Sequence, residues 1–214
     1  MSFYLQLQQE TTESRNNLLS IPYLQQGAAG ALSVESYLAF LGQAYHHVKH
    51  TIPLLMACGS RLPERLEWLR TAIGKYIDEE MGHQEWIIND INESGGDGEA
   101  VRKEKPLPAT EIMVAYAYDT ILRCNPAGFF GMVLVLEGTS IALATSAAAA
   151  IQSSTGLPQA AFSYLTSHGD LDIGHVDFFH GLMDRLDSPD DQQAVIHCGR
   201  IFYQLYGDIF RSLS

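Results

Sequence analysis

The feature that most restricts how this chain can fold is a long stretch almost free of ionisable side chains. Between Arg123 and His168, Glu137 is the only Asp, Glu, Lys, Arg or His. A helix that is apolar on nearly all sides is either buried in a protein core or spans a membrane. The small residues of this stretch, and the ordinary polarity of the rest of the chain, favour a central core helix over about residues 125–152.

A single carboxylate inside such a helix needs a partner. Ionised and isolated in an apolar core it would cost several kcal/mol, so Glu137 must be protonated, hydrogen-bonded or bound to a metal ion. The sequence around Glu137 does not distinguish among these three states. A metal ion becomes the preferred interpretation once two further groups of polar residues are counted.

The rest of the chain is predicted to be helical. Apolar residues recur at helical spacing, and no segment alternates between apolar and polar with a period of two. We therefore expect an all-α protein with one domain over residues 1–214. The predicted helices cover about residues 2–20, 33–57 with a kink or early end at Pro53, 62–91, 110–123, 125–152, a segment that includes 167–180, and 189–211. The longest predicted loop is 92–108.

Charge and cysteine content restrict the class of protein. The net charge of −12 argues against nucleic acid or an anionic membrane as a partner. Cys58, Cys124 and Cys198 are widely spaced, which is typical of free thiols in a reducing compartment. The first residues lack the pattern of a signal peptide, so we expect a cytoplasmic protein.

One polar row lies on the predicted helix that includes residues 167–180. At about 100° per residue, His168, Asp172 and His175 fall within about 60° of one another, and the row continues into Phe179 and Leu182. Two imidazoles and a carboxylate aimed into a core are most simply explained as metal ligands. The alternatives are a buried hydrogen-bonded cluster, or a helix turned so that this row faces water.

A second polar group is the Glu-x-x-His sequence formed by Glu80 and His83. Glu80 falls among the apolar positions Ile73 and Ile77 of the predicted helix over 62–91, which places it on the inward side. Helical di-iron carboxylate proteins use this spacing to supply metal ligands from one helix face. The spacing also arises by chance on exposed helices, so its inward position carries the argument.

The three groups together form a mixed set of nitrogen and oxygen donors from three core helices. Six ligands suit two metal ions, and this donor set suits iron or manganese better than a lone zinc, although another divalent metal remains possible. The proposed ligands are Glu80, His83, Glu137, His168, Asp172 and His175.

In their order and spacing, these motifs resemble the haem-oxygenase-like di-iron oxidases, also called iron-containing redox enzymes. This group is related to the TENA-like thiaminases and the pyrroloquinoline-quinone synthases. The resemblance implies a bundle of about seven or eight helices, a non-haem centre of two iron ions, O2 as co-substrate, a small organic substrate, and a homodimer. It also implies that the six residues are the metal ligands.

The chain departs from this family's pattern on an early helix, where many members have a further carboxylate ligand. Here the sequence runs from Tyr45 to His50 with three histidines. His47, at the edge of the apolar stripe, is a further candidate ligand. His46 and His50 are expected to face solvent or to stand behind the ligands.

The resemblance therefore predicts a metal-dependent oxidoreductase, and two other functions stay open. A TENA-type aminopyrimidine hydrolase of thiamine salvage needs a cysteine nucleophile, and the three cysteines lie near predicted helix ends or on the last helix, which disfavours it. A non-catalytic metal-binding or interaction protein would use the same cluster structurally. If the chain is an enzyme, the candidate residues for a pocket wall are Tyr76, Tyr116, Tyr118 and Phe130.

Overall fold

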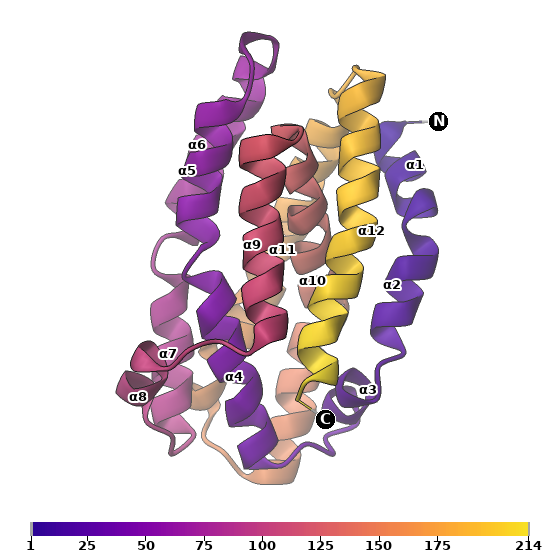
Figure 1. The fold of residues 1–214 in the computed structure, drawn as a ribbon. Helices are drawn as coiled ribbons and strands as arrows, with labels where there is room; N and C mark the ends of the chain where they lie inside the picture. Colours follow the sequence, from indigo (N-terminus) through magenta and orange to yellow (C-terminus); the bar gives the residue numbers. More distant parts are fainter. Residues whose placement is uncertain (1, 214) are drawn as a thin grey trace.

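The chain folds into an upright bundle of helices (Figure 1). The computed structural model describes residues 2–213, and of residues 168–176 it describes only the backbone. Within these residues the regular structure is entirely helical, which confirms the predicted all-α fold and single domain. The α-helices are α1 (Phe3–Glu10), α2 (Thr12–Leu19), α3 (Pro22–Ala28), α4 (Val34–Val48), α5 (Thr51–Arg61), α6 (Glu67–Glu80), α7 (His83–Glu93), α8 (Gly98–Lys103), α9 (Pro108–Arg123), α10 (Phe130–Thr155), α11 (Ser163–Asp184) and α12 (Pro189–Arg211). Short 3-10 helices are η1 (Glu64–Leu66), η2 (Pro126–Phe129) and η3 (Gln159–Phe162).

The described residues thus contain more helices than the sequence predicted, for two reasons. Three predicted helices are each broken into two, giving α1 and α2, α4 and α5, and α6 and α7. In addition, α3 and α8 form in segments predicted to be connections, so the predicted loop over residues 92–108 is partly helical.

Local sequence signals account for several helix starts. Ser33 Oγ accepts a hydrogen bond from the Ser36 amide at the start of α4, at 3.1 Å. Asn125 Oδ1 accepts from the Ala127 amide at 3.0 Å, which starts η2 and leads into α10. Pro189 occupies the first turn of α12, where its missing amide costs nothing. These helix starts are as predicted.

The core is built around α10, which packs against α11 and α12 (Figure 1). The segment Pro126–Thr155 is long and apolar enough to cross a membrane, but 61% of its most apolar window is buried inside the bundle. Two glycines allow the closest approach: a Cβ added to Gly131 would lie 2.4 Å from the Gly199 amide nitrogen of α12. A side chain at position 131 would therefore force α10 and α12 apart.

The prediction of one continuous helix over residues 62–91 is wrong. α6 ends at Glu80, and α7 begins at His83, directly after Gly82. The φ of Gly82, +94°, lies in the left-handed region. Glycine reaches this conformation without the steric penalty that a Cβ brings. Glu80 and His83 therefore come from the end of one helix and the start of the next, not from one helix face.

The predicted helix over residues 33–57 also breaks, but earlier than expected. α4 ends at Val48 and α5 starts at Thr51, which places Pro53 in the first turn of α5. Proline is tolerated there because first-turn amides have no partner within the helix. α5 then continues through Gly59 to Arg61, past the predicted end.

Candidate metal and substrate site

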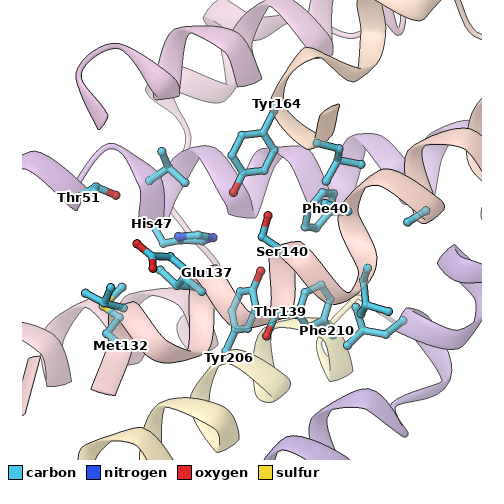
Figure 2. Close-up of a pocket in the computed structure, with 18 of the residues that line it drawn as sticks. Phe40, His47, Thr51, Met132, Glu137, Thr139, Ser140, Tyr164, Tyr206 and Phe210 are labelled. Atoms are coloured by element: carbon cyan, nitrogen blue, oxygen red, sulfur yellow. The ribbon is translucent and has the colours of Figure 1, made fainter. Parts of the chain in front are cut away.

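A mostly apolar cavity of about 160 Å³ lies inside the bundle, bounded by α3, α4, α5, α6, α10, α11 and α12 (Figure 2). Its charged or titratable wall residues other than tyrosines are His47, Glu80 and Glu137. The structure therefore brings two of the predicted ligands, and the further candidate His47, to the wall of one cavity. A concave apolar cavity with a few convergent polar groups is the usual form of a small-molecule site.

The two carboxylates are close enough to affect the same tyrosine. Burial, and after it the negative charges of Glu137, Glu79 and Glu80, raise the pKa of Tyr76. Tyr76 itself is fully buried and lines the cavity. One carboxylate oxygen of Glu137 is buried, and the Glu80 side chain is only 15% exposed. This part of the cavity is here called the negative end, because the two carboxylates in their ionised form would attract a bound cation.

His83 reaches the same region by pairing with Glu80. Its Nδ1 lies 2.9 Å from Glu80 Oε2, and its side chain is 3% exposed. The imidazole also stacks on Trp86, with ring centroids 4.0 Å apart. His83 is not among the described residues that line the cavity, so it is connected to the cavity wall through Glu80.

The burial of the histidines that follow Tyr45 differs in part from the prediction. His46 and His47 are both buried, so of the two placements expected for His46, facing solvent or standing behind the ligands, the first is wrong. Burial, with Lys49 and His50 nearby, lowers the pKa of His46 to about 4, and its Nδ1 lies 3.1 Å from Lys49 Nζ. His50 contacts Tyr118 instead. Only His47 faces the cavity, where Figure 2 shows it beside Glu137.

A buried carboxylate on α7 holds the start of α11 against the cavity. Asp90 is fully buried and accepts hydrogen bonds from the Ser163 and Tyr164 amides at 2.9 and 2.8 Å. Burial raises the pKa of Asp90 although these bonds oppose the rise. Tyr164, one residue into α11, lines the cavity. Asp90 therefore positions the helix that carries the remaining predicted ligands.

Those remaining ligands, His168, Asp172 and His175, lie outside the described side chains, and their role stays a prediction. Among the side chains that are described, no three His, Cys, Asp or Glu residues gather as a complete metal site. The described donors do fit one side of a site for a hard or borderline cation, because they are carboxylates and imidazoles around a buried negative end. A complete metal site would therefore need further ligands from α11.

Several cavity residues were not identified from the sequence. Thr51, Ser140, Tyr164 and Tyr206 all line the cavity. A signal was available for Ser140, because it lies one helical turn after Glu137 and so on the same face. Tyr206 lies far away in sequence and reaches the cavity only through the packing of α12 on α10.

Of the predicted pocket-wall residues, only Tyr76 lines the described cavity. Tyr116 lies against Cys198 and Phe202, and Tyr118 packs on His50. Phe130 is fully buried in the core. Their aromatic character marked them as buried, but burial in the core and exposure to a cavity cannot be told apart by periodicity.

The comparisons with known proteins agree with this fold. A family described as iron-containing redox enzymes matches residues 38–207. That range contains every residue proposed above as a metal ligand. No curated protein matches the chain.

Solved structures share the architecture at low sequence identity. A domain of unknown function with a haem oxygenase-like fold from Shewanella denitrificans OS217 has a TM-score of 0.87 and 23% identity, over 98% of this chain and 91% of that chain. A TenA homologue from Pseudomonas syringae pv. tomato DC3000 has a TM-score of 0.81 and 11% identity, over 99% and 92%. Haem oxygenase-1 from Synechocystis sp. PCC 6803, in complex with haem, has a TM-score of 0.78 and 12% identity, over 100% and 93%. At these identities the likeness concerns the haem oxygenase-like fold alone.

Proposed function

We propose, from the premise that this chain belongs to the family of iron-containing redox enzymes, that it is a non-haem iron oxidase or oxygenase. It would use O2 as co-substrate and act on a small organic molecule bound in the cavity. The observation that carries the proposal is the position of Glu80 and Glu137 on the wall of one apolar cavity, with His83 paired to Glu80.

The residues proposed to hold iron come from three parts of the chain. Glu80, His83 and Glu137 are supported by their placement, and His47 is a further candidate on the cavity wall. The sequence pattern adds His168, Asp172 and His175 from α11. Two iron ions suit this number of ligands, and manganese has similar preferences. Bound iron would supply the activation of O2, which side chains alone do not provide.

The chain's own residues prepare this chemistry in two ways. Tyr76 stays protonated because burial and the neighbouring carboxylates raise its pKa, so its hydroxyl can donate to a carboxylate without adding negative charge. The apolar wall around it limits access of water, which strengthens the interaction between the carboxylates and a cation. The pair formed by His83 and Glu80 fixes the direction in which that carboxylate points.

Anaerobic titration with Fe(II), followed by exposure to O2, tests the proposal. We expect about two ions per chain by the ligand count, O2 consumption and a transient absorbance. Glu137→Gln should lower iron affinity and O2 consumption at least about tenfold, whereas Glu111→Gln, an exposed glutamate, should leave both unchanged. O2 consumption that survives chelation, or that Glu137→Gln leaves intact, would contradict it.

The TENA-type hydrolase is the weaker alternative because the described cavity wall holds no cysteine. Cys58 is buried with Sγ 3.4 Å from the Pro126 carbonyl oxygen, and burial raises the pKa of its thiol to about 12. Such a thiol is almost entirely protonated at neutral pH and is a poor nucleophile. A non-catalytic metal-binding protein would bind iron in the same titration without consuming O2.

A further inference from the structure

A second cavity, of about 340 Å³, lies where α1, α2, α11 and α12 meet a different face of α10. On α10 it is lined by Gly138 and Ile141, and Gly138 is about 100° around the helix axis from Glu137. None of its described lining residues also lines the cavity of the proposed iron site. Figure 1 shows α1 and α2 beside α12. This second cavity is here called the polar pocket, after its other lining residues, which are Tyr4, Gln8, Arg15, Asp177 and Tyr203.

The polar side chains of α1 and α2 form one chain of hydrogen bonds along the wall of the polar pocket. The Arg15 guanidinium donates to Gln8 Oε1, and Gln8 Nε2 donates to the Tyr4 hydroxyl at 3.1 Å. An arginine has only donors, so it must face the oxygen of the Gln8 amide and not its nitrogen. Tyr4 is therefore the acceptor at the end of this chain, and its own O–H remains available as a donor.

A buried tyrosine on α12 adds a second hydroxyl to the same wall. Tyr203 is only 2% exposed. Burial raises its pKa to about 12, although the charge and a hydrogen bond of Arg15 act in the opposite direction. The hydroxyl is therefore protonated at neutral pH. Because Arg15 cannot accept, Tyr203 accepts from it and keeps its own proton to donate. The wall is thus rich in hydrogen-bond donors.

Two opposite charges line the polar pocket without a charged partner among the described side chains. Arg15 forms no ion pair with them, and neither does Asp177. Arg15 is partly buried beside neutral groups, where a carboxylate would form strong, charge-assisted hydrogen bonds with it. Asp177 is exposed, which places it at the open side of the pocket. There it would attract a cationic group.

We infer that the polar pocket binds a small zwitterion, whose carboxylate accepts hydrogen bonds from Arg15 and Tyr203 and whose ammonium group pairs with Asp177. A short aliphatic part of the ligand would lie against Ile141 and Gly138. Space is available there, because a Cβ added to Gly138 meets nothing within 4 Å. The ligand class is thus that of amino acids with a carboxylate and an ammonium group. The inference goes beyond the proposed function and does not depend on it.

Titration of the full chain, followed by amide NMR shifts, tests the ligand class with glycine, γ-aminobutyrate and ε-aminocaproate. Each is compared with the carboxylate and the amine of the same chain length, without metal and again with redox-inert Zn²⁺. In both states the tightest zwitterion should bind better than its matched carboxylate and its matched amine. A zwitterion that binds no better than either of them would overturn the inference.

Two matched pairs of variants locate the ligand. Arg15→Gln should weaken binding of the tightest zwitterion at least about tenfold, because charge-assisted hydrogen bonds are lost. Arg61→Gln, at an exposed position of α5, should have no effect. Gly138→Phe should abolish binding by filling the pocket, whereas Gly181→Phe, equally uncrowded but outside the lining, should not. Equal effects within either pair would overturn the inference. If Gly138→Phe does not fold, the arginine pair and the ligand comparison still decide.

The role of Asp177 has a test in which the two ligands change in opposite directions. Asp177→Asn should weaken binding of the zwitterion about two- to fivefold, because one exposed ion pair is lost. The same variant should strengthen binding of the matched carboxylate, because a negative charge near it is removed. A variant that changes both affinities in the same direction would contradict the pairing with the ammonium group.

These binding measurements need neither iron nor O2, which separates the two proposals. A chain that consumes O2 with Fe(II) but does not prefer zwitterions contradicts this inference only. A chain that binds zwitterions in the polar pocket but never consumes O2 contradicts the oxidase proposal only.

Discussion

Glu80 Oε2 and His83 Nδ1 lie 2.9 Å apart across a helix break, with Gly82 between them in the left-handed region. The two residues would also be neighbours on one continuous helix. The break changes their surroundings, because His83 becomes the first residue of α7 and stacks on Trp86, while Glu80 ends α6 at the cavity wall.

Gly82→Ala should destabilise the protein by about 1–2 kcal/mol, because an alanine at φ +94° brings its Cβ against its own backbone. No neighbouring atom lies within 4 Å of the added Cβ, so the cost is conformational. Gly74→Ala, within α6 and equally uncrowded, should instead gain about 0.5–1 kcal/mol. Urea unfolding measures the free energy of unfolding of both variants. Equal stability of Gly82→Ala and Gly74→Ala would contradict the left-handed conformation of Gly82.

Gly131→Ala should cost at least about 1–3 kcal/mol, because its Cβ would press on the backbone of α12 rather than on a flexible side chain. The control is Gly138→Ala on the same helix, where the added Cβ meets nothing within 4 Å and helix propensity should give a small gain. Thermal unfolding should separate the two variants clearly. Similar midpoints would mean that α10 and α12 are not in close contact there.

Asp191→Asn should lower the free energy of unfolding at pH 7 by about 2 kcal/mol. Asp191 is fully buried and accepts hydrogen bonds from Arg65 and, at 2.8 Å, from Asn125 Nδ2. Burial alone would raise the pKa of Asp191, but these bonds outweigh it and lower the pKa below 3.8.

A carboxyl whose pKa is lower in the folded state contributes stability above its unfolded pKa, and that stability is lost as pH falls through the folded value. The difference between the wild type and Asp191→Asn should therefore shrink below about pH 4. Asp190→Asn, at the exposed neighbouring position, should show little difference at any pH. Urea unfolding at several pH values measures both, and a gap that widens in acid would contradict the pairing.

Only one of the three cysteines should react with iodoacetamide at pH 8 in the folded protein. Cys124 is exposed, whereas Cys58 and Cys198 are buried and burial raises the pKa of both thiols. Alkylation needs an accessible thiolate, so mass spectrometry should find one adduct when folded and three in urea. Rapid modification of Cys58 in the folded protein would contradict this prediction and would support a cysteine nucleophile.

The sequence by itself determined the helical class and the buried position of the helix that carries Glu137. A long run without ionisable side chains has to be removed from water wherever its partners lie, so no tertiary information is needed. The capping residues Ser33 and Asn125 accept hydrogen bonds from amides two or three residues further on, and Pro189 needs no partner in the first turn of α12, so the helices they start were predicted from local sequence.

Only the tertiary structure decided where long helices break and which polar residues face the cavity. A glycine such as Gly82 is tolerated inside a helix or in a left-handed turn, and the packing of α7 selects between them. His46 and His47 are adjacent in sequence and both buried, but only His47 faces the cavity, because α4 is covered on more than one side. Side-chain burial depends on elements that are distant in sequence, and periodicity along one helix cannot include them.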